Sequence, residues 1–237
     1  MCWSFGAAGI LAIFGFVVAI YLAYKKRSKL LWIPIIYFSL MELLQAVTYP
    51  FIGQCDLPIN QILAFLGFIH ITFQPFFVNA LTMYFIPKHV REKIQGWVYT
   101  VCFISAIIML TKLYPFDWAG QCAGPLDSRM CGPDLCSIWG EWHLAWHIPL
   151  NGIEGLTSWG YTLPVFILPL IYGAWRILGY IAIAPLLANL TTSSLTEEPA
   201  VWCLFSVAFL VVVFIKPLMK WLHVKKWYFW KYPFKKS

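Results

Sequence analysis

The sequence predicts an all-α integral membrane protein, a single domain built as a bundle of seven transmembrane helices. Hydrophobic residues make up 61% of the 237 positions and charged residues only 11%, whereas soluble domains carry about 45–50% and about 25%. The mean hydropathy is +0.73, and apolar runs separated by short polar stretches fill the chain. These observations exclude a soluble enzyme, a disordered chain and a nucleic-acid-binding module, and they make membrane lipids the expected surroundings.

Seven apolar runs define the expected helices, because about 20 residues of helix cross the hydrocarbon core. The first run is expected to be a retained helix rather than a signal peptide, since its basic cluster follows the run and no cleavage site is evident. The sixth run is short and contains Pro185. The expected spans are residues 5–23, 30–52, 61–86, 97–113, 156–175, 177–192 and 200–217.

The basic residues predict the orientation of the bundle. Fifteen of the 17 Lys and Arg follow the first, third, fifth and seventh runs, and only Lys112 and Arg129 lie on the other side. The positive-inside rule therefore places the C-terminus in the cytoplasm and the N-terminus outside. The tail 216–237 mixes lysines with aromatic residues, which is typical of a segment lying at the membrane–water interface.

Five cysteines fall on the expected outer side, and none falls in an expected cytoplasmic loop. Disulfides persist outside the cytosol, so we expect one or two bridges, with the pairing left open and one cysteine left over. The outer loop 114–140, rich in Gly, Pro and Asp, is expected to be a disulfide-stapled cap. The five cysteines are Cys2, Cys55, Cys122, Cys131 and Cys136.

Ionisable residues inside the spans are candidates for function, because they are costly in lipid. Glu42 lies about 18 Å above the inner end of the second span, and His70 in the third lies about 16 Å above it. Gln45 lies on the same helix face as Glu42, and Gln74 lies on the same face as His70. The matched depths predict a Glu42–His70 contact, which is either a functional site or a polar pair that joins two helices.

A second pattern lies in the segment 140–152. His143 and His147 are four residues apart, so on a helix they would point the same way, as two metal ligands must. Glu141 and Glu154 are near in sequence, but the motif H-E-x-x-H is absent because Leu144 follows His143. The alternative is an amphipathic turn in an interfacial belt of Trp residues.

Combined, the two patterns predict a metal-dependent enzyme that acts on a lipid or another small amphipathic molecule. Imidazoles with a carboxylate suit Zn²⁺, which would support hydrolysis, or Fe²⁺, which would support oxidation or desaturation. A haem b held by His70 and His147 is the less favoured version. Glu141 or Glu154 would act as catalytic base, and Gln45 and Gln74 would orient the bound group. The expected metal ligands are Glu42, His70, His143 and His147.

Two other classes of function remain open. A proton-coupled transporter would use Glu42 and His70 as a relay, and a structural or assembly subunit of a membrane complex would use the Trp-rich surface as an interface. A retinal Schiff base is not expected on the seventh run, since residues 200–215 contain no Lys, and no Gly-rich phosphate loop is present.

Several strings carry a resemblance to a known family. They are Met1-Cys2-Trp3-Ser4, Met41-Glu42-x-x-Gln45, His70-Ile71-x-Phe73-Gln74-Pro75-Phe76-Phe77-x-Asn79, Tyr114-Pro115-Phe116-Asp117-Trp118-Ala119-Gly120 and Gly140-Glu141-Trp142-His143-Leu144-Ala145-Trp146. With them, residues 1–152 resemble a family of uncharacterised bacterial multi-pass membrane proteins. The resemblance implies location in the bacterial inner (plasma) membrane and no assigned activity. The layout also resembles the alkaline ceramidase and progestin-receptor-like zinc hydrolases, but the seventh run lacks their paired histidines.

Overall fold

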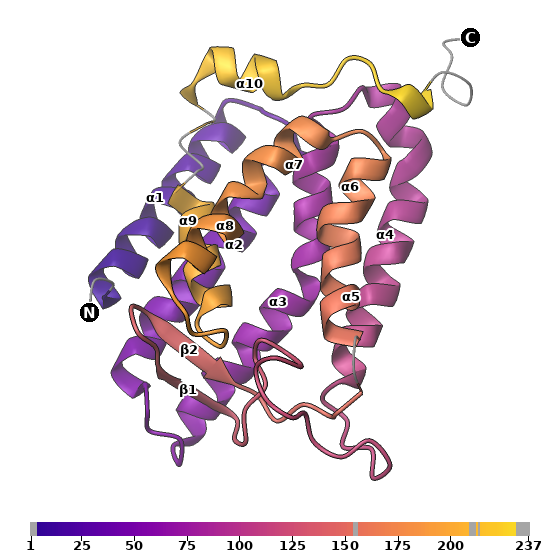
Figure 1. Cartoon of the computed structure of the whole chain (residues 1–237). Helices are drawn as coiled ribbons and strands as arrows, with labels where there is room; N and C mark the ends of the chain where they lie inside the picture. Colours follow the sequence, from indigo (N-terminus) through magenta and orange to yellow (C-terminus); the bar gives the residue numbers. More distant parts are fainter. Residues whose placement is uncertain (1–3, 154–155, 209–211, 213, 231–237) are drawn as a thin grey trace.

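Four long helices form most of the bundle in the computed structural model, which describes residues 4–153, 156–208, 212 and 214–230 (Figure 1). They are α1 (Phe5–Tyr24), α2 (Lys29–Thr48), α3 (Pro58–Tyr84) and α4 (Lys88–Thr111). Each is long and apolar enough to cross a membrane, so the chain has the helices of a membrane protein.

Local sequence sets where these helices begin. The Ser4 hydroxyl accepts a hydrogen bond from the Ala7 N–H at 3.4 Å, and the Ser28 hydroxyl accepts one from Leu30 at 3.3 Å. These contacts cap α1 and α2, because the first N–H groups of a helix have no partner within it. Pro58 opens α3, where its missing N–H costs nothing.

The last three apolar runs form shorter, interrupted helices. The fifth run is α5 (Leu156–Thr162), the π-helical turn η2 (Leu163–Ile167) and α6 (Leu168–Ile171). The sixth is α7 (Trp175–Ile181) and α8 (Ile183–Thr191), and the seventh begins as α9 (Glu198–Ala208). These apolar segments span only 10–17 residues. The expected seventh span, 200–217, runs partly over residues 209–211 and 213, which lie outside the described residues.

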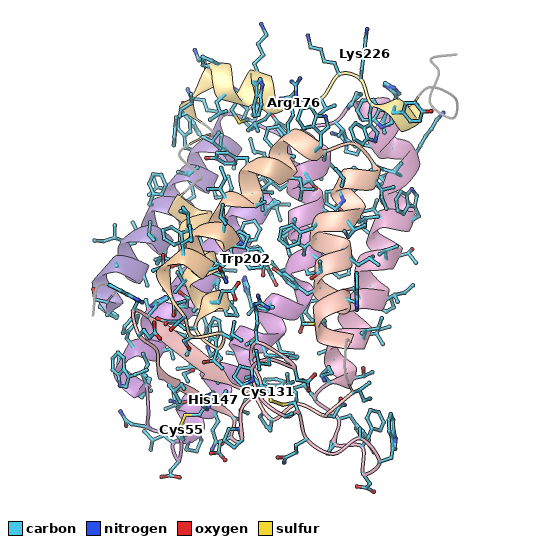
Figure 2. All side chains as sticks on the ribbon, in the orientation of Figure 1. Cys55, Cys131, His147, Arg176, Trp202 and Lys226 are labelled. Atoms are coloured by element: carbon cyan, nitrogen blue, oxygen red, sulfur yellow. A yellow bond between two sulfur atoms is a disulfide. The ribbon has the colours of Figure 1, made fainter. Side chains whose placement is uncertain are left out.

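The two ends of the bundle differ in structure. Strands β1 (Cys136–Trp139) and β2 (Leu144–His147) form an antiparallel hairpin at one end, which we call the hairpin end (Figure 1). Helix α10 (Lys216–Leu222) lies across the opposite end, the α10 end, and is followed by the short turn η4 (Tyr228–Trp230). Figure 2 shows His147, Cys55 and Cys131 at the hairpin end, and Arg176 and Lys226 at the α10 end.

The hairpin corrects one expectation from the sequence. His143 ends the turn before β2 and His147 is the last residue of that strand, so the segment between them is not helical. Residues four apart lie about 6 Å apart along a helix, but about 13 Å apart along a strand. The spacing therefore does not bring these two imidazoles together.

Two disulfides staple the hairpin end, as expected. Cys55 in the α2–α3 loop is bonded to Cys136 in β1, and Cys122 is bonded to Cys131 within the long loop. Cys102 and Cys203 are free and buried. The fifth expected outer cysteine, Cys2, lies outside the described residues, as do Lys231, Lys235 and Lys236 of the basic tail.

Candidate functional site

His143 joins the hairpin to α2. Its side chain is 2% exposed; Nε2 lies 2.7 Å from Oε1 of Gln45, and Nδ1 lies 2.5 Å from the Tyr49 hydroxyl. Gln45 directs its amide N–H to the Ala200 carbonyl, so its oxygen faces His143. Nε2 therefore carries the proton and donates it to Gln45, while Nδ1 accepts from Tyr49. Burial lowers the pKa of His143 to about 4, so the imidazole is neutral at pH 7. Both of its ring nitrogens are then used in hydrogen bonds, one to Gln45 and one to Tyr49.

Glu197 fixes the turn that carries His143. Its carboxylate accepts the backbone N–H groups of Glu141 at 2.9 Å, Trp142 at 2.7 Å and His143, and also the Thr192 hydroxyl at 2.5 Å. It is fully buried, and these donors compensate its charge. Glu197 is not among the residues predicted from the sequence. The available signal was an acidic pair just before an apolar run, since acids favour a helix N-terminus.

Glu141, expected as a catalytic base, is instead an exposed part of this turn. Its carboxylate accepts hydrogen bonds from the Ser193 hydroxyl and from the Ser193 N–H at 3.3 Å. The Ser193 hydrogen bonds lower the pKa of Glu141. A charged, solvent-facing carboxylate of this kind holds two loops together.

Glu42 has no such compensation. It is 0% exposed, and neither carboxyl oxygen has a hydrogen-bond partner among the described residues. The Cys203 thiol of α9 and the Tyr49 hydroxyl lie close enough to interact with it electrostatically. A buried acid without a partner is costly, so packing alone does not explain why position 42 carries a glutamate.

His70 packs among aromatic side chains between α2 and α3. Its ring stacks on Tyr37 at 3.8 Å between centroids, and Tyr37 stacks on Phe77 at 3.6 Å. Together with Phe73 these side chains line an open groove between α2 and α3. Nε2 of His70 has no partner within the described part of the chain, so the predicted Glu42–His70 contact is not made through a hydrogen bond.

His147 is the last residue of β2. It pairs with Cys136 across the hairpin, and a Cβ added at Gly132 would lie 2.4 Å from its side chain. Among the described residues, no group of three or more His, Cys, Asp or Glu could hold a metal ion. Glu154 lies outside the described residues. The structure therefore does not bring together the four expected ligands Glu42, His70, His143 and His147.

The bundle does contain a cavity of about 270 Å³. Its walls are mostly apolar, and its polar lining includes Gln74, whose Oε1 accepts a hydrogen bond from the Tyr161 hydroxyl at 2.9 Å. The irregular turn η2 and the segment after the α7–α8 break contribute Phe166 and Pro185. Irregular backbone at membrane depth is tolerated where it lines a cavity. The lining residues are Phe68, Ile71, Gln74, Met109, Ser128, Arg129, Met130, Tyr161, Thr162, Phe166, Pro185, Glu198, Pro199, Trp202 and Cys203.

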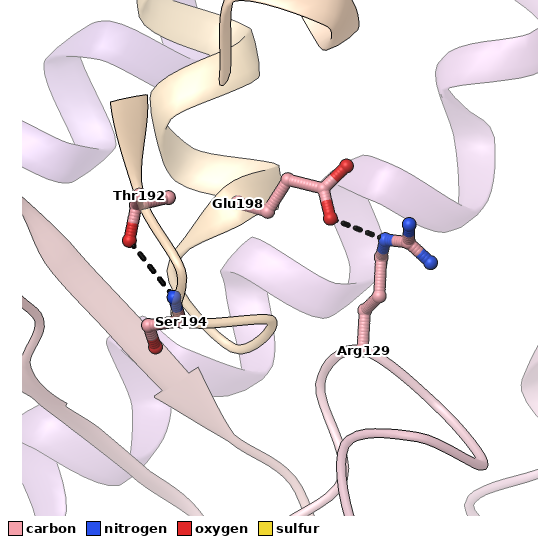
Figure 3. Close-up of polar contacts among 4 residues, drawn as sticks. All are labelled: Arg129, Thr192, Ser194 and Glu198. Atoms are coloured by element: carbon pink, nitrogen blue, oxygen red, sulfur yellow. Dashed lines mark hydrogen bonds and ion pairs between the residues drawn. The ribbon is translucent and has the colours of Figure 1, made fainter. Parts of the chain in front are cut away.

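An ion pair lies at the hairpin end of this cavity. Nε of Arg129 donates to Oε2 of Glu198 at 2.6 Å (Figure 3). The Arg129 side chain is 54% exposed and that of Glu198 only 9%. In the turn before α9, the Thr192 hydroxyl accepts the Ser194 N–H at 3.1 Å. The cavity thus combines an apolar body with one charged, partly solvated end.

Comparison with known proteins gives a family but no activity. A model of a family of unknown function (DUF5765) matches residues 6–223. No curated protein and no solved structure matches the chain. The expected membership in an uncharacterised family is therefore confirmed.

Proposed function

The chain belongs to the DUF5765 family, and we propose that it binds a small amphipathic molecule inside the membrane. The observation that carries this proposal is the cavity. Its apolar walls, such as Phe68 and Met109, suit a hydrocarbon body, and the Arg129–Glu198 pair suits a polar end. Ligand sites are typically apolar hollows with a few placed polar groups.

We propose that this site lies in a seven-span bundle in the bacterial inner membrane. The three shorter helical segments would stand beside the four long helices and close the cavity. The hairpin end would face outside, because disulfides persist there. The α10 end would face the cytoplasm, since it carries basic residues such as Arg176 and Lys226.

Binding is favoured over metal-dependent catalysis by the donor groups at the cavity. The described lining offers one thiol, two aliphatic hydroxyls, one ion pair and one amide–phenol pair. Zn²⁺ and Fe²⁺ sites need three or more converging N, O or S ligands, and the described residues gather no such set.

Filling the cavity tests the proposal. Met109 is 4% exposed and lines the cavity, whereas Ile107 on the same helix is 46% exposed. We would purify the wild type, Met109→Trp and Ile107→Trp in nanodiscs, extract them and analyse the extract by mass spectrometry. The wild type and Ile107→Trp should retain an amphipathic molecule enriched over the bulk lipid, and Met109→Trp should lose it. Retention by a folded Met109→Trp protein contradicts the proposal.

A second candidate is a proton-coupled carrier, favoured by the unpartnered Glu42. An isolated charged carboxylate is costly at this depth, so Glu42 would hold a proton in the resting state. Dicyclohexylcarbodiimide reacts with protonated carboxyl groups in apolar surroundings, and peptide mass spectrometry locates the adduct. We expect modification of Glu42 but not of the exposed Glu141, and none at position 42 in Glu42→Gln. Failure to modify Glu42 under conditions that modify other buried acids would count against a proton-carrying role.

A further inference from the structure

We propose that the ligand is an acidic amphiphile, whose anionic end binds Arg129 and whose hydrocarbon body fills the cavity. This inference rests on the proposed function and adds the charge of the ligand. Three features of the Arg129–Glu198 pair support a negative charge on the ligand. They are the N–H groups of Arg129 that remain free to bind it, the greater exposure of Arg129, and the neutral residues around the pair.

Arg129 is the partner that an incoming ligand meets. Glu198 is 9% exposed and already accepts the Arg129 Nε–H, whereas the Arg129 side chain is 54% exposed. A cationic ligand would therefore have to displace Arg129 to reach the carboxylate. An anionic ligand can add to the guanidinium without breaking the existing contact.

The guanidinium retains donors for this purpose. Arginine carries five N–H donors in a planar fork, and within the described part of the chain the only hydrogen bond found for Arg129 is the one from Nε. Figure 3 shows its two terminal nitrogens turned away from Glu198. This edge matches a carboxylate or phosphate, which bind arginine in a bidentate manner.

The neighbouring residues are compatible with an anion. Asp127 is the acid nearest in sequence, but it is not part of the cavity lining and interacts electrostatically with Lys112. The remaining described lining is neutral apart from Glu198, whose charge Arg129 balances. Buried Ser128 lies at the same end and offers a hydroxyl donor.

The length of the cavity sets the size of the hydrocarbon body. Along α3 the lining extends from Phe68 to Gln74, which is about 9 Å of helix. The lining also includes Met109 from α4 and Trp202 from α9. A medium-length chain or a small ring system fits this depth better than a full-length phospholipid.

Three probes with one tail and different ends test the charge. Radiolabelled octanoate would be bound to the full chain in nanodiscs, with empty nanodiscs subtracted, and unlabelled octanoate, octylamine and 1-octanol would compete. We expect octanoate to compete best and octylamine least. Arg129→Gln should weaken octanoate binding by about tenfold, while leaving the affinity for 1-octanol unchanged. The control Arg176→Gln removes an arginine at the α10 end and should change neither affinity.

The outcomes separate this inference from the proposed function. If octylamine competes as well as octanoate, or if Arg129→Gln leaves octanoate binding unchanged, the acidic ligand is wrong, although the cavity can still bind a neutral or cationic molecule. Saturable octanoate binding that persists in Met109→Trp would place the probe elsewhere and overturn the inference. Loss of every probe in Met109→Trp, together with the Arg129 effect, supports both.

Discussion

Nε2 of His143 and Oε1 of Gln45 lie 2.7 Å apart, and this contact attaches the turn before β2 to the end of α2. It is a neutral hydrogen bond inside a nearly sealed site, since His143 is 2% exposed. The hairpin therefore depends on an imidazole that stays uncharged.

Acid should loosen this attachment. Burial lowers the pKa of His143 from 6.5 to about 4, so the unfolded chain takes up its proton before the folded chain does. The neutral side chain contributes its full stability above pH 6.5, and that contribution is lost as the pH falls towards 4. The difference corresponds to about 3 kcal/mol. Unfolding at a series of pH values should show a steeper loss in the wild type than in His143→Gln, and identical slopes would contradict the assignment.

Glu197 should be essential to the same turn. In Glu197→Gln, an amide N–H₂ would replace one acceptor oxygen and face backbone N–H donors. We expect the free energy of unfolding to fall by about 2–3 kcal/mol, as for other hydrogen bonds to buried charged groups. Glu141→Gln is the matched control, because that carboxylate is exposed and accepts none of the turn's backbone N–H groups that Glu197 accepts. Chemical denaturation in one detergent compares the two, and equal losses would show that Glu197 has no special role.

The two disulfides should differ in their contribution. Cys55–Cys136 joins residues 81 apart in sequence, and Cys122–Cys131 joins residues only 9 apart. Closing the longer loop removes more entropy from the unfolded chain, with expected contributions of about 4–5 and about 3 kcal/mol. Thermal unfolding of two variants, one with Cys55 and Cys136 and one with Cys122 and Cys131 changed to Ser, measures which disulfide contributes more to stability. A larger loss from removing Cys122 and Cys131 would show that local strain or packing outweighs loop closure.

Helix α1 provides a test of close packing against α2. A Cβ added at Gly15 would lie 1.9 Å from the Ser39 hydroxyl, whereas one added at Gly9 would meet nothing within 4 Å. Gly15→Ala should therefore destabilise the protein by about 1–3 kcal/mol through overpacking. Gly9→Ala should be neutral or stabilising, because alanine favours a helix. Melting temperatures of the two variants compare them, and equal shifts would exclude a tight α1–α2 contact at Gly15.

Much of the fold was accessible from local sequence. The four long apolar runs became α1 to α4, since a stretch of about 20 apolar residues has few alternatives to a membrane-length helix. Disulfide bridges at one end were expected, because five cysteines fall in segments predicted to lie on the outer side of the membrane. The hairpin was missed, because four-residue strands such as Leu144–His147 are too short for a clear period-two pattern.

The candidate site was less accessible, because its partners are distant in sequence. Glu197 meets the turn at Glu141–His143 across more than fifty residues, and Arg129 meets Glu198 across 69. Glu42 and His70 have similar expected depths, yet depth does not fix the rotation of a helix about its axis. The residues therefore occupy different surroundings: Glu42 is in the core, and His70 lies beside the groove with Tyr37.

The sequence by itself determined the class of protein, its long helices and the side of the chain that carries disulfides, because composition, run length and cysteine position are properties of local segments. The tertiary structure decided which polar groups meet: His143 with Gln45, Glu197 with the turn, and Arg129 with Glu198 at the cavity. Such pairings depend on helix rotation and loop docking, which are set by the packing of the whole chain.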